Sequence, residues 1–359
     1  MSRVVNRLAN MNKTTRSSVF TYALVVGAFV ILQLLRMTTG LGSVLEGQLI
    51  PICAYVTMAL ALNLVVGVSG ELSLGHAGFM SIGAFLGCAA ANGLAELIPF
   101  TPVRLGVAMV IGAALAGFFG FLIGIPVLRL NGDYLAIVTL AFGEIIKNVI
   151  NVLYVGADAN GIHIAMKKAD LNLQEGGQVI IEGAKGITGT PKAATFAIGI
   201  ILVLLTLFIV LNLMNSRSGR AIMAIRDNRI AAESVGINIT KYKLMAFSIS
   251  ASLAGVAGVL YAHNLSSLAA TPKSFGYNMS IMILVYVVLG GIGNIRGSII
   301  AAVILTLLPE LLRGLNNYRM LIYAVVLIVM MLFNSAPKAI AMRERIMEKF
   351  HKKNAKEAA

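Results

Sequence analysis

The chain has 359 residues, of which 58% are apolar and 12% charged, and its mean hydropathy is +0.86. Typical soluble domains are about 45–50% apolar and about 25% charged. The composition therefore excludes an ordinary soluble domain and predicts a polytopic membrane protein. The net charge of +14 at pH 7 would suit nucleic acid. The cations lie at the borders of apolar runs without aromatic residues among them to stack bases, so we expect no nucleic-acid partner.

A window of about 19 residues, the length that spans a bilayer as a helix, predicts ten membrane-spanning helices. The predicted fold class is therefore an all-α polytopic membrane protein of about ten transmembrane helices, with no second, soluble domain. The helices are expected near residues 19–35, 48–68, 72–93, 103–125, 134–155, 194–214, 243–262, 278–291, 297–312 and 319–335.

Lysine and arginine indicate the orientation, because short basic loops stay on the cytoplasmic side of a membrane. Most of the basic residues fall on one side if both termini are cytoplasmic. This predicts a cytoplasmic N-terminal segment (1–18), a transmembrane domain (19–335) and a basic cytoplasmic tail (336–359). Within the domain, 215–243 is expected to be a cytoplasmic loop and 156–193 an extracytoplasmic loop. No small-residue cleavage site follows Leu35, so the first apolar run is interpreted as a retained span.

Small residues recur four positions apart on several predicted spans, and both cysteines lie in apolar runs. In lipid, such small-residue faces let helix backbones approach closely. We expect helix contacts at these positions, and no disulfide framework from Cys53 and Cys88. The small-residue faces include Gly83 with Gly87, Gly112 with Ala116 and Gly120, Gly120 with Gly124, and Ala251 with Gly255.

Catalytic and metal-binding signatures are missing from the sequence. It contains no Gly-Lys dipeptide and therefore no Walker A loop for ATP phosphates, and its four histidines are too dispersed for a zinc-protease pair. We expect no catalytic residue, no metal ligand and no cofactor on this chain. Any ATP that drives transport must then bind to another chain.

A polar segment interrupts the second and third predicted spans, at residues 63–78. Its candidate functional residues are Asn63, Glu71, Ser73 and His76. A helix broken here would expose backbone groups, which are tolerated at membrane depth only where protein buries them or a watery cavity adjoins them. The segment therefore either lines a translocation path or forms a plain cytoplasmic turn whose Glu71 and His76 are solvated.

The fifth predicted span carries a polar stripe. Glu144, Lys147, Asn148 and Asn151 are spaced i, i+3, i+4 and i+7, so they share one helical face. A charged residue at the centre of a membrane helix costs about 2.5–3.5 kcal/mol on an insertion scale. We expect this face to point into the bundle, with Glu144 and Lys147 offsetting each other. Contact with substrate and a purely structural role both remain open for the stripe.

The longest polar interruption between spans is 215–243. Residues 220–235 contain no proline or glycine and predict a short helix that Gly236 ends, with Ile222, Ile225 and Ile230 available for docking. Such a helix either rests on the membrane surface through its positive charge or contacts a soluble motor subunit.

These segments resemble the permease subunits of ABC importers for branched-chain amino acids, in particular the M-type of the two membrane subunits. The resemblance covers most of residues 50–335 and is specific only when its parts are combined. Those parts are Leu62-Asn-Leu-Val-Val-Gly67 with Leu74-Gly-His-Ala-Gly78, Gly132-Asp-Tyr-Leu-Ala-Ile-Val-Thr139 with Phe142-Gly-Glu-Ile-Ile146, residues 217–236, and Val288-Leu-Gly-Gly-Ile-Gly293.

The resemblance implies a multi-pass protein of the bacterial inner membrane that forms a heterodimer with a second permease subunit. Two cytoplasmic ABC ATPase subunits would bind ATP and Mg²⁺, and an extracytoplasmic solute-binding protein would deliver the solute. It also makes 217–236 the segment that couples to the ATPases, with Ile230 in place of the glutamate of the general importer motif. The implied coupling residues are Gly219, Arg220, Arg226, Asp227, Ala231, Ala232 and Gly236.

For the solute, the resemblance implies leucine, isoleucine and valine, although related importers move urea, short amides or other amino acids. Two other classes of protein remain open. A secondary transporter driven by an ion gradient would need an acidic coupling site, for which Glu71 and Glu144 are the candidates. A membrane scaffold would transport nothing, and no complex containing it would hydrolyse ATP in response to a solute.

Overall fold

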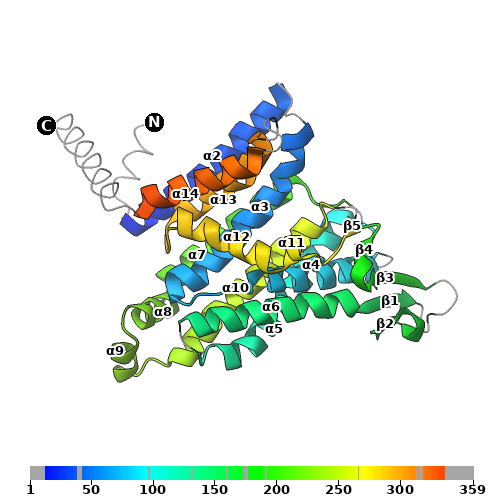
Figure 1. Cartoon of the computed structure of the whole chain (residues 1–359), viewed down its shortest axis with the longest axis horizontal. Coiled ribbons are helices and arrows are strands. Elements are labelled where there is room, and N and C mark those ends of the chain that lie inside the picture. The colour runs from blue at the N-terminus through cyan, green and yellow to red at the C-terminus, as the bar shows by residue number, and fades with distance from the viewer. Residues whose placement is uncertain are drawn as a thin grey trace.

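The structure of the chain is a computed structural model. It describes residues 13–38, 43–95, 98–130, 132–158, 161–171, 173, 177–190, 192–265, 267–312, 314 and 318–335. This part of the chain is mostly helical, with two small sheets (Figure 1). The predicted fold class, an all-α polytopic membrane protein, is confirmed. The expected N-terminal segment 1–18 is described only from residue 13, and the expected tail 336–359 lies outside the described residues.

A helix lies at each of the ten predicted spans. Seven stretches are long and apolar enough to cross a membrane, and they comprise α2, α3 with its extension, α5, α6, α7, α10, and residues 272–290. Helices α4, α13 and α14 fall outside this group, so the count of ten spans stays a prediction. The bounds are α2 (Lys13–Thr38), α3 (Ser43–Asn63), α4 (His76–Gly93), α5 (Thr101–Val127), α6 (Asp133–Val152), α7 (Phe196–Asn215), α10 (Ile239–Ala262), α12 (Tyr277–Gly290), α13 (Ile295–Leu311) and α14 (Arg319–Ser335).

Helices α4, α5 and α10 pack closely through glycine. Gly83 of α4 lies against Gly255 of α10, where a Cβ on Gly83 would overlap the backbone of Gly255. Gly112 of α5 faces Gly83 and Val259, and Gly120 faces Ala251. The predicted small-residue faces therefore lie at helix contacts, as expected for helices that associate by close backbone packing in lipid.

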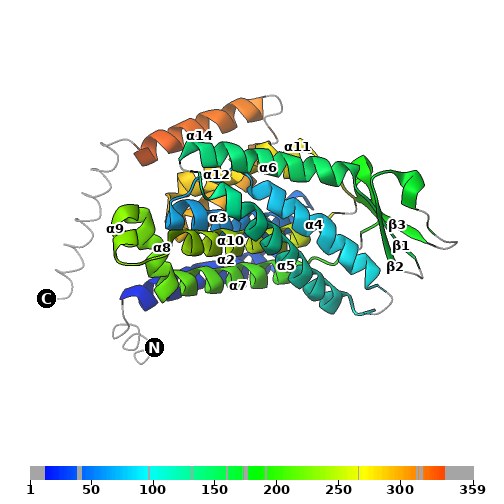
Figure 2. The same ribbon diagram turned by 90° about the horizontal axis from the view of Figure 1, so that it is seen from below.

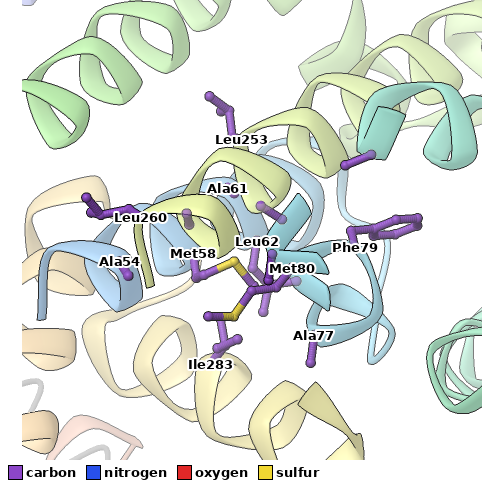
Figure 3. Packing of buried hydrophobic residues seen from close by; sticks show 14 of the residues in the cluster. Ala54, Met58, Ala61, Leu62, Ala77, Phe79, Met80, Leu253, Leu260 and Ile283 are labelled. Atoms are coloured by element: carbon purple, nitrogen blue, oxygen red, sulfur yellow. The ribbon is translucent and has the colours of Figure 1, made fainter. Parts of the chain in front are cut away.

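The centre of the bundle is filled by apolar side chains from α3, α4, α10 and α12. Figure 3 shows Met58 of α3, Met80 of α4 and Ile283 of α12 coming together, and all three are fully buried. Cys53 and Cys88 are free and buried in the same bundle. The interior therefore contains few polar groups, and the buried polar side chains are candidates for functional residues.

The described part of residues 154–188, named the outer region after its expected side, forms strands where the sequence analysis expected only a loop. Strands β1 (Tyr154–Asp158), β2 (Gly161–Ala165) and β3 (Gln178–Glu182) pair antiparallel in the order β2-β1-β3. Strand β4 (Ile187–Thr188) pairs with β5 (Ser267–Leu268), and two short 3-10 helices, η2 (Lys168–Leu171) and η3 (Gly183–Lys185), complete the region. The predicted span 134–155 ends at Val152, because Leu153 turns extended and Tyr154 begins β1.

An ion pair at the edge of this sheet lies outside the candidate membrane-spanning helices. Lys168 Nζ lies 2.6 Å from Glu182 Oε1, and Lys185 Nζ lies 3.8 Å from Glu182 Oε2. The hydrogen bond and charge of Lys168 lower the pKa of Glu182, and the carboxylate in turn raises the pKa of Lys168. The pair is therefore ionised at neutral pH and links β3 to η2.

The 215–243 segment forms two short helices instead of the one predicted over 220–235. Helix α8 (Arg217–Asp227) and helix α9 (Arg229–Ser234) meet at Asn228, whose backbone is extended and whose side chain accepts the Ala231 N–H to cap α9. Aspartate and asparagine favour such caps over helix interiors. Figure 2 shows α8 and α9 at one end of the bundle and β1–β3 at the opposite end. The side of the membrane on which each end lies stays a prediction.

Candidate translocation and coupling sites

The polar segment 63–78 is a broken helix buried inside the bundle. Helix α3 continues into the π-helical turn η1 (Leu64–Ser69), Gly70 ends it with φ +75°, and α4 begins at His76. Glu71 is 9% exposed and His76 is 0% exposed. The expected solvation of both side chains in the alternative, a plain cytoplasmic turn, is therefore wrong, since protein surrounds them.

Hydroxyl groups from other helices satisfy the backbone at the break. The Leu74 N–H donates to Thr139 Oγ1 of α6 at 3.0 Å, and the Ala77 N–H donates to Ser280 Oγ of α12 at 3.1 Å. Unpaired backbone groups in a membrane interior cost several kcal/mol each, so non-helical backbone persists there only with such partners. The break is consequently a supported feature of the fold, held by α6 and α12.

Glu71 forms a buried ion pair with Lys243 in the first turns of α10. Their side chains are 11% and 7% exposed. The sequence analysis placed Lys243 at the start of a span but not among the candidate site residues. The missed signal was electrostatic, because a lysine inside an apolar helix requires a carboxylate partner, and Glu71 is one of the few available.

Ser73 and His76 belong to a second buried polar chain. Ser250 of α10 donates its proton to the Ala61 carbonyl, so it accepts from His76 Nε2, which lies 2.6 Å away. Neutral His76 then carries its proton on Nε2, and Nδ1 accepts from Ser73 Oγ at 3.4 Å. The chain joins the start of α4 to α10 and to the last turns of α3.

Asn63, the last residue of α3, forms hydrogen bonds to the turn between α12 and α13 and to the start of α13. Its Nδ2 donates to Ser298 Oγ at 2.9 Å, and its Oδ1 accepts the Gly293 N–H at 2.9 Å. Both donor and acceptor groups of the buried amide are thus paired. The side chain fixes the broken helix against α13.

The polar stripe of α6 is only partly directed into the bundle. Glu144 pairs with Lys147, as the sequence analysis expected, and Glu144 Oε1 accepts the Tyr277 N–H of α12 at 2.7 Å. Asn151 Nδ2 donates to the Ala270 carbonyl at 3.0 Å. Asn148 is exposed at a shallow cleft of about 370 Å³ beside Val149, so it does not share the inward direction expected for the stripe.

The coupling candidates divide into packed and exposed positions. Ala232 packs with Ile225 and Ile239, and Gly219 lies against the Leu213 carbonyl where a Cβ would clash. Gly236 has φ +84° and follows α9, as predicted for the residue that ends the helix. The remaining candidates are exposed, namely Arg220, Arg226, Asp227 and Ala231.

Ile230 does not dock inward as expected. Ile222 and Ile225 are buried, but Ile230 on α9 is 81% exposed and the nearby Val235 is 75% exposed. The break at Asn228 turns α9 away from the face that α8 buries. Two large aliphatic side chains therefore project from the end of the bundle that carries the basic loop.

Two further observations concern possible sites for a metal ion or an apolar ligand. Among the residues that the structure describes, no three His, Cys, Asp or Glu side chains are grouped to hold a metal ion. An apolar cavity of about 460 Å³ lies between α2, α3, α7 and α13, and none of the candidate site residues lines it.

The apolar bundle with a buried polar break is the architecture of a polytopic membrane transport protein. The chain belongs to the family described as "Branched-chain amino acid transport system / permease component", whose sequence profile matches residues 44–333.

Individual relatives agree with this family. The chain is 37% identical over 289 residues to the high-affinity branched-chain amino acid transport system permease protein LivM of Escherichia coli (strain K12) and equally to that of Salmonella typhimurium (strain LT2). The match covers 78% of this chain but 66% of each relative, slightly less than two thirds of their length. The ribose import permease protein RbsC of Escherichia coli is 33% identical over 130 residues, 34% of this chain and 40% of the relative. No solved structure matches the chain.

Proposed function

We propose that this chain is the permease subunit of an ATP-driven, binding-protein-dependent importer for leucine, isoleucine and valine. It would lie in the bacterial inner membrane with both termini in the cytoplasm. Its partners would be a second permease subunit, two ATPase subunits that bind ATP and Mg²⁺, and an extracytoplasmic solute-binding protein. Membership of the branched-chain permease family supports this proposal, as does the name of the LivM relatives.

The observation that carries the proposal is the pair of exposed aliphatic side chains on the 215–243 segment. Ile230 and Val235 project from α9 and the residues after it, at the end of the bundle where the basic loop lies. In this proposal the two side chains belong to the contact site for the ATPase subunits, because large aliphatic side chains on a charged surface can anchor a protein interface. A helix resting on the membrane would bury its apolar face, but here α8 already buries Ile222 and Ile225 within the protein.

The mechanism follows from how a ligand biases a two-state protein. A transporter alternates between inward-open and outward-open packings, and ATP favours one of them only through contacts that differ between the two. Helices α8 and α9 are joined directly to α7 and α10. Closure of the ATPases on α9 would therefore displace these two helices relative to α3 and α4.

The translocation path in this proposal passes the broken helix and the polar stripe of α6. Its residues would be Asn63, Glu71, Ser73, His76, Glu144, Lys147, Asn148 and Asn151. In the conformation described here Asn63, Glu71, His76 and Glu144 bond to neighbouring helices. Lys147 pairs with Glu144 on the same helix, and Asn151 donates to the Ala270 carbonyl. A zwitterion with an aliphatic side chain requires a mostly apolar wall with a few polar groups, which this set and its surroundings provide.

An ion-gradient transporter is a weaker explanation of the same structure. Its coupling site would require an acidic group free to bind the ion, whereas Glu71 is paired with Lys243 and Glu144 with Lys147. Neither of the two acidic candidates, both among the described residues, is therefore free to bind a coupling ion.

Reconstitution tests the proposal. The chain is assembled in liposomes with the associated permease, ATPases and binding protein, and ATP turnover is measured with leucine, isoleucine, valine, urea and short amides. We expect the branched-chain amino acids to raise turnover and to be taken up. Stimulation of ATP turnover by urea alone would show that the substrate is urea and not a branched-chain amino acid. Uptake by the chain alone under an ion gradient would contradict the proposal.

A further inference from the structure

The C-terminal end of η1 lies against α8. A helix leaves its last four carbonyl groups without helical N–H partners. The chain leaves η1 after Ser69, and the Gly67 carbonyl instead accepts a hydrogen bond from Arg226 Nη1 at 2.8 Å. A cation is also favourable at this end of a helix, where the dipole is negative. Helix α8 therefore supplies the donor and the charge that the broken helix lacks.

The guanidinium of Arg226 is held in this position from two sides. Its Nε and Nη2 donate to Asp227 Oδ1 at 3.0 and 2.9 Å. Its aliphatic stem crosses Gly70, where a Cβ would come within 2.6 Å of Arg226 Cγ. Gly70 has φ +75°, which glycine adopts without strain. The absence of a side chain at Gly70 is thus what lets Arg226 reach the carbonyl.

Other contacts tie the broken helix to the rest of the bundle. Asn63 binds the α12–α13 turn, and Glu71 pairs with Lys243 of α10. The contact of Arg226 differs because it comes from the segment between α7 and α10, the part of the chain proposed to meet the ATPases. A shift of α8 would consequently reach residues 63–76 through Arg226 as well as through the connected helices.

We propose that Arg226 is a positioning residue that makes the broken helix 63–76 follow movements of α8. This inference rests on the proposed function and specifies how the coupling segment reaches the candidate translocation path. The chain connections move α7 and α10, and the Arg226 contact moves η1 and residues 70–76 with them. Without it, ATP hydrolysis continues but the broken helix responds less.

The test measures the exposure of the broken helix in the whole reconstituted complex. Leu72, a half-buried residue of the break, is replaced by cysteine as a reporter. Its maleimide labelling rate is compared with and without ATP and vanadate, and the same chain lacking the reporter gives the background from buried Cys53 and Cys88. Solute uptake per ATP hydrolysed is measured on the same preparations.

Three variants change the contact, and one serves as a matched control. Arg226→Met removes the donor, Gly70→Ala displaces the arginine from the opposite side, and Arg226→Lys retains a charged donor. Arg129→Met removes an exposed arginine that follows α5 and lies outside residues 217–236.

We expect the first two variants to assemble and hydrolyse ATP and to lose most of the nucleotide dependence of labelling. They should take up about tenfold less solute per ATP, the factor that about 1.4 kcal/mol produces. Arg226→Lys should restore part of the nucleotide-dependent labelling and part of the uptake, and Arg129→Met should match the native complex. Native labelling and uptake in Arg226→Met would overturn this inference and leave the proposed function intact. A native complex without solute-stimulated ATP hydrolysis would instead overturn the proposed function, and this inference with it.

Discussion

At the scale of single residues, several buried polar side chains are paired across helices that lie far apart in sequence. Asn63, Glu71 and His76 each bind a group on α10 or α13 or in the turn before α13. Their pairing explains why an apolar bundle retains charged residues. A buried ion pair adds little net stability, but the loss of one partner leaves an uncompensated charge that costs about 3–5 kcal/mol.

The Glu71–Lys243 pair gives the first prediction. Lys243→Met should lower the melting temperature of the purified complex strongly, because Glu71 then remains buried and unpaired. Adding Glu71→Gln to Lys243→Met should restore much of the lost melting temperature, since the double variant carries no unpaired charge at this site. Thermal unfolding in detergent measures both. Equal destabilisation by Lys243→Met in the presence and absence of Glu71→Gln would show that the two residues do not interact.

At the scale of helices, close approach depends on positions without side chains. Gly255 of α10 meets both Gly112 and Ala116 of α5, and a Cβ added at Gly255 would lie 2.5 Å from the Ala116 Cβ. Packed helices have little room to adjust, so added volume shifts backbones.

Gly255→Leu should therefore destabilise the bundle by at least the cost of overpacking, about 1–3 kcal/mol. Gly106→Leu is the matched control on α5, because nothing lies within 4 Å of a Cβ at Gly106. The yield of monodisperse protein and its thermal stability compare the two variants. If they are equally stable, the proposed helix contact is absent in the membrane.

Helix α9 leads to a prediction about assembly. Ile230→Asp should weaken ATPase binding by about 2 kcal/mol, more than tenfold in Kd, because an exposed aliphatic anchor is replaced by a charge. Ile164→Asp on β2, a similarly exposed isoleucine at the other end of the bundle, should leave ATPase binding unchanged. Co-purification of the ATPases from membranes measures the difference. ATPase recovery unaffected by Ile230→Asp would contradict the proposed docking role.

The sequence predicted the positions of helices better than it predicted which side chains contact each other. Apolar length alone located helices at all ten expected positions, and i, i+3 spacing predicted the Glu144–Lys147 pair, because both signals are local. The Glu71–Lys243 pair and the outward position of Ile230 depend on how distant segments pack. The strands of the outer region are five residues or fewer, too short for a hydropathy window to detect.

At the scale of the whole molecule, the two ends of the bundle differ. One end carries α8 and α9 with their basic residues and exposed aliphatic side chains, and the other carries the β1–β3 sheet with its Glu182–Lys168 pair (Figure 2). The broken helix contacts the α8 end of the bundle through Arg226. Closure of the ATPases on α9 can therefore change the solvent exposure of the broken helix, provided that the α8–α9 end faces the cytoplasm.

Cysteine labelling of Ile230→Cys in spheroplasts tests this central claim most directly. The reagent is a membrane-impermeant maleimide, with Lys185→Cys of the outer region as the reference position. The account predicts that Lys185→Cys is labelled in intact spheroplasts, whereas Ile230→Cys is labelled only after the membrane is permeabilised. Labelling of Ile230→Cys in intact spheroplasts would place α9 outside the cell and contradict coupling to cytoplasmic ATPases.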